Sequence, residues 1–181
     1  MNRKMINGDK VFEIHEFLSC DECERHVERS EGIGYETFTI DGEVFPGYRN
    51  NARVVVDDPV LADTLWNRAV EHMPPVIEGQ PASGFNPRFR FYRYTGIESF
   101  APHHDGSVRV GDRASRLTFM VYLTDVPKGG ETRFYGDDLK IRFAVRPERG
   151  KALVFDHLIL HEGVAVEDGS KYVLRTDVMY G

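Results

Sequence analysis

The half of the chain that begins at residue 88 is a series of short segments in which apolar and polar side chains alternate. They lie at residues 88–94, 117–123, 132–135, 140–145, 152–155 and 172–180. Alternation with a period of two is the pattern of a strand whose two faces are covered differently. Turn signals separate several of these segments, at residues 129–130, 136–137 and 147–150. Many short strands at this spacing predict a β-sandwich or barrel, and a jelly roll is one solution.

The first 75 residues differ because they contain two helix signals. Ser19 is typical of an N-cap, and Glu22 three residues later completes a capping box, which predicts a helix from Cys20 to about Arg29. Asp58-Pro59 starts a second helix, with the aspartate as N-cap and the proline at the first position. Short extended segments are also expected at residues 11–17 and 53–56. We therefore expect an α+β chain, mainly β, in which a helical segment at about 1–75 supports a β core at about 88–181.

Two further segments are assigned from turn signals alone. Asp41-Gly42 favours a tight turn, so residues 35–45 are predicted to form a hairpin. Residues 76–87 are rich in glycine and proline and are predicted to form an irregular loop.

Length and composition favour a soluble globular protein. With 181 residues and 41% hydrophobic content, the chain is long enough for one domain and short for two, so residues 1–181 are expected to form a single domain. The formal net charge of −6 argues against a general nucleic-acid surface. No run has the apolar length of a membrane span, and the first ten residues lack the apolar core of a secretion signal. A cytoplasmic location without membrane contact is the expectation.

Cys20 and Cys23 form a Cys-x-x-Cys pattern, with His26 three residues later. In a reducing compartment this spacing occurs in redox pairs and in half of some zinc sites. The chain contains no other cysteine, so a four-ligand zinc site would lack a matching second pair. We interpret both cysteines first as ordinary positions of the first helix.

His103 and Asp105 form a His-x-Asp pair near a predicted strand end. Side chains two residues apart on extended chain point to the same side, so an imidazole and a carboxylate can face one ion. His161, far downstream, is the candidate third ligand. Two histidines and one carboxylate are typical of non-haem Fe(II) sites that keep positions open for oxygen and substrate. The alternative is that His103 and Asp105 are solvated loop residues.

Further motifs lie on both sides of these residues. They are Phe17-Leu18-Ser19, Arg93-Tyr94-Thr95-Gly96, Pro102-His103-His104-Asp105, Leu117–Leu123, Gly129–Phe134, Gly150–Phe155, His161-Glu162-Gly163 and Gly169-Ser170-Lys171-Tyr172. In this order, and over nearly the whole chain, they resemble the prolyl 4-hydroxylase-like branch of the 2-oxoglutarate and Fe(II)-dependent dioxygenases. The ordered set is far more specific than any single motif.

The resemblance implies a double-stranded β-helix, a jelly-roll and cupin-like fold, which agrees with the strand pattern. It also implies that His103, Asp105 and His161 are the iron ligands and the catalytic centre. His104 lies between two ligands and is expected to point the other way. Asp156 and His157 are rival metal ligands by residue type, but they lack the Glu-Gly continuation that follows His161.

The implied cofactors are Fe(II), 2-oxoglutarate as cosubstrate and O2, with ascorbate as a candidate reductant. The implied reaction is hydroxylation of a substrate C–H bond with release of succinate and CO2, the protein supplying ligation and orientation. The substrate is a small molecule, a free amino acid or a protein side chain, and the sequence does not indicate which. It indicates nothing about oligomeric state.

The distal carboxylate of 2-oxoglutarate needs a cation and a hydroxyl donor. Lys171, ten residues after His161, matches the basic position of the branch, and Arg175 shares its strand face, so both are candidates. Tyr94 and Tyr122 match tyrosines that face the cosubstrate in relatives, and Thr118 shares the inward face of Tyr122. For each tyrosine the alternative is ordinary core packing with a satisfied hydroxyl.

The chain departs from the branch in regions that select substrate. Tyr94-Thr95-Gly96 lacks the usual proline, and the loop from Gly106 to Ser115 carries three charged residues. Collagen-type prolyl hydroxylation is therefore not expected. Two other functions stay open: a non-catalytic jelly roll that binds a metal or ligand, and a nucleic-acid oxidative demethylase. The second is suggested by a cluster of arginines, Arg88, Arg90 and Arg93.

Overall fold

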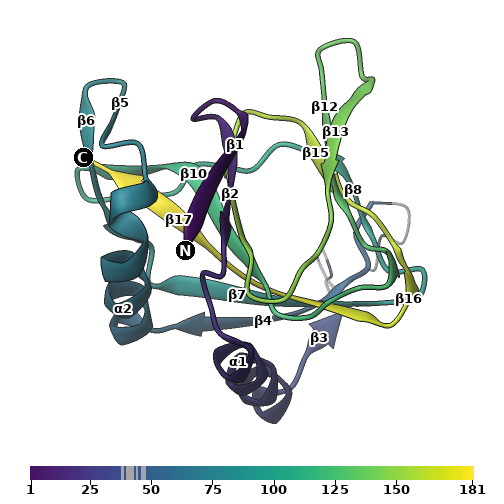
Figure 1. Cartoon of the computed structure of the whole chain (residues 1–181). Helices are drawn as coiled ribbons and strands as arrows, with labels where there is room; N and C mark the ends of the chain where they lie inside the picture. The colour runs from purple at the N-terminus through teal and green to yellow at the C-terminus, as the bar shows by residue number, and fades with distance from the viewer. Residues whose placement is uncertain (38, 40–42, 44, 46–47) are drawn as a thin grey trace.

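The computed structural model describes residues 1–37, 39, 43, 45 and 48–181, and a large antiparallel sheet crosses its centre (Figure 1). In spatial order this sheet contains β1 (Asn2–Asn7), β2 (Val11–His15), β14 (Ala152–Asp156), β10 (Arg113–Tyr122), β17 (Ser170–Tyr180), β7 (Arg88–Thr95), β4 (Ala52–Asp57) and β3 (Glu36–Thr37). It is extended by β5 (Val76–Ile77), β6 (Gln80–Phe85) and β9 (Arg109–Val110). Strands β10 and β17 form its middle.

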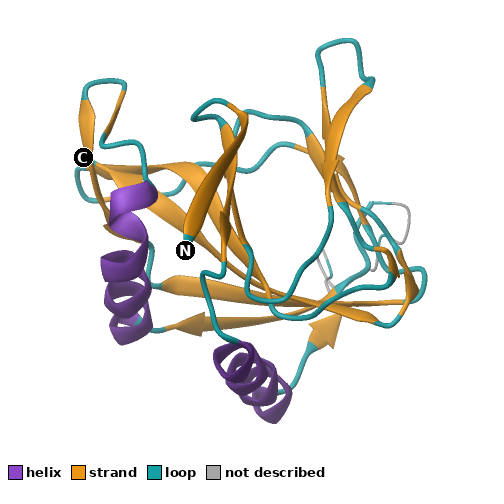
Figure 2. Cartoon of the chain, in the orientation of Figure 1, coloured by secondary structure: helices purple, strands orange, loops and turns teal. Residues whose placement is uncertain are grey.

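A smaller sheet faces the large one. Its spatial order is β13 (Ile141–Val145), β12 (Thr132–Tyr135), β15 (His161–Gly163) and β8 (Phe100–His103). A two-stranded ribbon consists of β11 (Lys128–Gly129) and β16 (Val166–Asp168). The helices are α1 (Cys20–Ile33), α2 (Pro59–Ala69) and the 3-10 helix η1 (Val70–His72). Figure 2 shows α1 and α2 on one side of the large sheet and the smaller sheet on the other.

The alternation in β10 separates two buried clusters. Leu117, Phe119 and Val121 pack into the cluster beneath the helices, whereas Met120 and Tyr122 pack into the cluster beneath the smaller sheet. Each fully buried apolar side chain of this kind contributes roughly 1.5–3 kcal/mol. The predicted period-two pattern of residues 117–123 is therefore confirmed.

The predicted capping box is present at the start of α1. The Ser19 hydroxyl accepts from Glu22 N at 3.2 Å, and the Glu22 carboxylate accepts from Ser19 N at 2.8 Å. Arg68 on α2 donates to both oxygens of the same carboxylate, at 2.7 and 2.9 Å, and so connects the two helices. The helix continues four residues past the predicted end, to Ile33, and Gly34 follows it with a positive φ of 95° and donates to the Ser30 carbonyl.

Three expectations about the first 87 residues need correction or fall outside the description. The segment at 1–75 is more than helical support: the expected strands at 11–17 and 53–56 are present as β2 and β4, and β1, which was not expected, joins them in the large sheet. Residues 76–87 are not an irregular loop: Glu78 and Gly79 both have positive φ, as a type I′ turn requires, and connect β5 to β6. The predicted hairpin turn at Asp41-Gly42 lies outside the described residues.

The Cys-x-x-Cys pattern is part of α1. Cys20 is exposed and Cys23 is buried, where burial raises the pKa of its thiol to about 11. Cys23 is therefore a protonated core residue at neutral pH, unlike the low-pKa thiol of a redox pair. Within the described residues, no helix combines the length and apolar character needed to cross a membrane.

Gly150 is in close backbone contact with the segment that leads into α1. Its carbonyl accepts from Phe17 N at 2.9 Å and Leu18 N at 3.0 Å, its φ is +79°, and an added Cβ would overlap the Leu18 carbonyl oxygen. Replacement Gly150→Ala should lower the free energy of unfolding by more than about 1–3 kcal/mol, because strain at positive φ adds to the overlap. Chemical denaturation measures this.

Gly32 is the matched control, because it lies inside α1 and its Cβ position is open. Gly32→Ala should instead stabilise by roughly 0.5–1 kcal/mol, as alanine does in a helix interior. Equal effects of the two alanines would contradict the assigned role of Gly150.

Candidate metal centre

His103, Asp105 and His161 meet where β8 and β15 lie side by side. His103 ends β8, His161 begins β15 directly opposite it, and Asp105 follows two residues after His103. One potential ligand atom from each of the three residues lies within 4.8 Å of the other two. The described part of the chain contains no other group of three such residues at this spacing. The structure thus brings together the three residues that the sequence nominated.

Both imidazoles are held by a backbone carbonyl two residues earlier in the chain. His103 Nδ1 lies 2.8 Å from the Ala101 carbonyl oxygen, and His161 Nδ1 lies 2.9 Å from that of Ile159. A carbonyl can only accept, so each Nδ1 carries the proton and each Nε2 has a free lone pair. The two Nε2 atoms lie 3.8 and 3.6 Å from the Asp105 carboxylate. Burial lowers the pKa of His103 to about 3 and also lowers the pKa of His161, so both rings are neutral.

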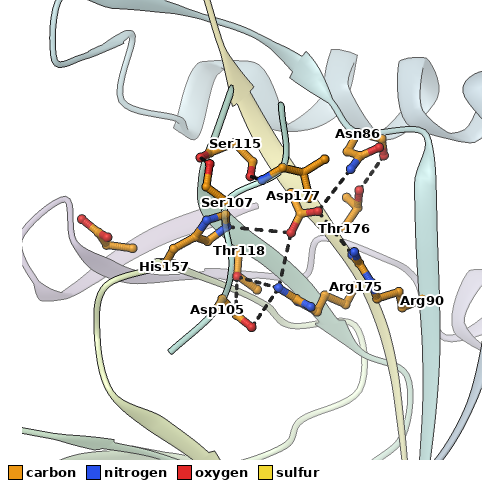
Figure 3. A network of polar contacts seen from close by, with 12 residues as sticks. Asn86, Arg90, Asp105, Ser107, Ser115, Thr118, His157, Arg175, Thr176 and Asp177 are labelled. Carbon is orange, nitrogen blue, oxygen red and sulfur yellow. Dashed lines mark hydrogen bonds and ion pairs between the residues drawn. The ribbon is translucent and has the colours of Figure 1, made fainter. Parts of the chain in front are cut away.

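Asp105 is ionised despite its burial. Burial by itself would raise its pKa, but Arg175 Nη2 at 3.0 Å, His161 and the Thr118 hydroxyl outweigh it and hold the pKa well below the usual range. Figure 3 shows Thr118 and Arg175 reaching the carboxylate from neighbouring strands. The centre therefore offers two neutral nitrogen donors and one carboxylate.

This donor set fits Fe(II). Ligands must be deprotonated to bind a metal, and all three already are. The three residues line one cleft, and a metal held by only three protein ligands would keep further coordination positions free. Phe100 covers the outer face of the His103 ring, with centroids 3.5 Å apart and an interplanar angle of 14°.

Lys171 lies in the wall of the same cleft. It is 2% exposed, its ammonium donates to the Gly130 carbonyl at 2.9 Å, and it lies 4.1 Å from the centre of the Tyr94 ring. Burial lowers its pKa from 10.5 to about 7, and Glu131 opposes the shift only partly. Among the described residues no carboxylate lies within ion-pair distance of it, so this cation has room for an anionic partner.

Arg175 is placed differently. Its Nη2 lies 3.0 Å from the Asp105 carboxylate, 3.3 Å from Asp177 and 3.2 Å from the Thr118 hydroxyl. It therefore lies beside the candidate ligand. Lys171 is four residues away along β17, or about 13 Å at the usual rise of a strand.

The three predicted hydroxyl residues have separate environments. Tyr94 and Thr118 line the cleft, but the Thr118 hydroxyl is used by Asp105. Tyr122 is fully buried and does not line the cleft; its hydroxyl is 2.7 Å from that of Thr132, which does. Sequence reasoning missed Thr132, although the alternation of β12 places it on the inward face with Phe134.

The remaining candidates lie outside the three-residue centre. His104 is exposed and borders a different cleft, as expected from its position between the two ligands. Asp156 accepts from Leu158 N at 2.8 Å and so closes a turn. His157 is buried, with its Nε2 3.8 Å from Asp177.

The three arginines do not form a basic stripe. Arg88 pairs with Asp57 at 3.5 Å, Arg90 with Asp177 at 3.2 Å and Arg93 with Glu31 at 2.9 Å. Alternation along β7 also places Arg93 on the opposite face from the other two. This arrangement removes the observation that suggested a nucleic-acid substrate.

Comparison with known proteins agrees with this geometry. Residues 89–176 match the model of the 2OG-Fe(II) oxygenase superfamily, a span that contains the two histidines, the aspartate and Lys171. Residues 89–176 of the chain are therefore similar to this superfamily. Within the superfamily the similarity is to the prolyl 4-hydroxylase-like branch, since prolyl 4-hydroxylases recur among the relatives.

Two Arabidopsis thaliana relatives illustrate this similarity. Prolyl 4-hydroxylase 1 is 24% identical over an alignment of 196 positions, which covers 90% of this chain and 66% of the relative. Probable prolyl 4-hydroxylase 11 is 43% identical over 61 residues, which covers 32% of this chain and 20% of the relative. The chain thus spans less than two thirds of the length of either protein.

Solved structures confirm the predicted fold. The viral collagen prolyl hydroxylase of Paramecium Bursaria Chlorella virus-1 superposes with a TM-score of 0.69 at 21% identity, covering 97% of this chain and 99% of that one. A prolyl hydroxylase from Trichoplax adhaerens gives 0.71 at 16% identity, covering 95% and 84%. The mainly β architecture with a double-stranded β-helix core is therefore as expected.

The burial of Lys171 predicts an unusual stability effect. Lys171→Met removes a cation whose charged form is disfavoured by burial, so the free protein should become more stable by roughly 2–4 kcal/mol at pH 6. The cost of the charge is complete below the folded-state pKa of about 7 and declines as pH rises toward 10.5. The gain measured by denaturation should therefore be smaller at pH 9, and a loss of stability at pH 6 would contradict this account.

Proposed function

We propose that the chain is a 2-oxoglutarate and Fe(II)-dependent dioxygenase that hydroxylates a C–H bond of a small-molecule or peptidyl substrate. The observation that carries the proposal is one cleft with a two-histidine, one-carboxylate cluster and a buried lysine. Bound Fe(II), with 2-oxoglutarate and O2, would supply oxidative decarboxylation to succinate and CO2 coupled to hydroxylation. Ascorbate would serve as a reductant in assays.

The protein's part is to hold and orient. His103 and His161 would donate Nε2 lone pairs and Asp105 a carboxylate oxygen, and these atoms are aligned by the backbone carbonyls of Ala101 and Ile159 and by Thr118. Such outer hydrogen bonds fix ligand orientation and raise ligand basicity.

Lys171 is the proposed partner of the distal carboxylate of 2-oxoglutarate. The keto acid end of the cosubstrate would chelate the iron, so its distal carboxylate must lie away from Asp105. Charge and position favour Lys171 over Arg175, because Arg175 already contacts two carboxylates beside the centre. Tyr94 and Thr132 line the cleft with hydroxyls that can add hydrogen bonds.

The apolar part of the cleft would exclude water. Tyr92, Phe100, Met120 and Val173 contribute to its lining. Exclusion of water strengthens the pairing of Lys171 with a carboxylate, since charges interact more strongly at low dielectric.

Two observations bear on the substrate. The Trichoplax neighbour is described as bound to a peptide fragment of hypoxia inducible factor, which supports a peptidyl substrate as one candidate. The departures at Tyr94-Thr95-Gly96 and in the loop at 106–115 leave a small molecule as the other.

Alanine at His103, Asp105 or His161 should abolish succinate formation. Each substitution removes one of three metal donors, so a loss of at least 100-fold is expected in an assay with Fe(II), 2-oxoglutarate, ascorbate and a substrate panel. His104→Ala is the control and should retain turnover. Iron-dependent activity that survives in the His161→Ala variant would refute the ligand assignment, and metal binding without any succinate from the unmodified chain would favour the non-catalytic alternative.

The affinity for 2-oxoglutarate should weaken as pH rises through 7. Lys171 is protonated below its pKa of about 7, and only that form attracts the carboxylate. Calorimetric titration of the Mn(II)-loaded chain should show a Kd roughly tenfold weaker at pH 8.5 than at pH 6.5. Lys171→Arg should flatten this dependence, because a guanidinium stays charged. An unchanged affinity for 2-oxoglutarate in the Lys171→Met variant would indicate that Arg175, and not Lys171, binds the distal carboxylate.

A further inference from the structure

Asp177 is a fully buried carboxylate that the proposed reaction does not use. It is 1% exposed and lies on β17 two residues after Arg175, so both side chains project from the same face. Figure 3 shows the side chains of Arg175, Arg90, Asn86 and His157 around it. An ionised carboxylate this deeply buried is costly unless it is fully paired, so its partners indicate its role.

Each oxygen of Asp177 is engaged by the protein itself. Oδ1 lies 3.3 Å from Arg175 Nη2, and Oδ2 lies 3.2 Å from both Arg90 Nη1 and Asn86 Nδ2. The residue does not line the metal cleft. Asp177 is therefore oriented toward Arg175 and the neighbouring strand rather than toward a ligand.

Arg175 joins this carboxylate to the candidate metal ligand. Its Nη2 atom lies 3.0 Å from Asp105 Oδ1, while the Thr118 hydroxyl donates to Asp105 Oδ2. One oxygen of Asp105 is thus oriented by Arg175 and the other by Thr118. A long arginine side chain has many rotamers, and a second anchor at Asp177 restricts it to the one that reaches Asp105.

Asp177 also balances the positive charge of Arg175. A divalent cation held by Asp105 would repel the adjacent guanidinium of Arg175. The carboxylate of Asp177 contacts the same Nη2 atom and compensates the charge of the guanidinium, so Arg175 can stay against Asp105 when the metal is bound.

We infer that Asp177 is a positioning residue for the metal centre, which acts through Arg175 to orient the Asp105 carboxylate. The inference rests on the proposed function, because it assumes that Asp105 is a metal ligand. It assigns Arg175 to the metal end of the cleft, whereas Lys171 is assigned to the distal carboxylate of the cosubstrate.

The test measures metal affinity by calorimetric titration of the purified chain with Mn(II) alone. Asp177→Asn keeps the shape of the side chain and removes its charge, and a 10- to 100-fold weaker Kd is expected, as for other outer partners of metal ligands. Arg175→Met should cause a similar loss. In the double variant the loss of Mn(II) affinity should be smaller than the sum of the two single losses, because both substitutions interrupt the same contact of Arg175 with Asp105.

Lys151→Met is the matched control for general destabilisation. Lys151 directly precedes β14, is 3% exposed, pairs with Glu13 of β2 at 3.1 Å and does not line the metal cleft. Its replacement also breaks a buried ion pair, but the Mn(II) affinity of the folded variant should stay within twofold of the unmodified chain. Thermal melts confirm that every variant is folded at the titration temperature.

The outcomes separate this inference from the proposed function. If the unmodified chain does not bind Mn(II), the proposed function fails. If it binds and Asp177→Asn binds within twofold, or if the two losses add, only the positioning role fails. If the Asp177→Asn variant does not fold, the Mn(II) affinity of the Arg175→Met variant is the test. An unchanged Mn(II) affinity in that variant overturns the inference.

Discussion

The structure depends on the two-sided burial of its central strands. In β10 and β17 one set of alternate side chains packs under the helices, and the other set faces the smaller sheet. A shift of register by one residue would exchange the two sets, and polar groups such as Lys171 and Asp177 would then face the apolar cluster beneath the helices. The hydrophobic pattern on one face therefore determines the position of the charged groups on the other.

Much of this arrangement could be predicted from the sequence, because a period of two is a local property. The alternation of residues 117–123 and the capping box at Ser19 follow from neighbours in the chain, and both are confirmed. The three candidate ligands were found from their residue types and from the order of motifs around them. The β5–β6 hairpin was missed because a Glu-Gly turn is a weaker signal than Asn-Gly or Asp-Gly.

The alternation does not predict how far along the cleft each charged side chain lies. Alternation places Lys171 and Arg175 on one face but does not tell which lies beside Asp105. That choice depends on the loop after β8, and on contacts such as Asn86 to Asp177, whose residues are 91 positions apart in the sequence. Tyr122 was overestimated for a related reason, since an inward residue can be buried behind Thr132 without reaching the cleft.

The hydrogen bonds from His103 and His161 to carbonyls two residues earlier have a consequence for how the protein can change over evolutionary time. Each ring takes its orientation from a three-residue piece of chain that ends at the histidine, so the two nitrogen donors need little from the rest of the chain. Loops around the cleft can then vary in length and charge while the donors keep their alignment. A scaffold of this kind can acquire new specificities without rebuilding its reactive centre, which is how one fold comes to host many functions.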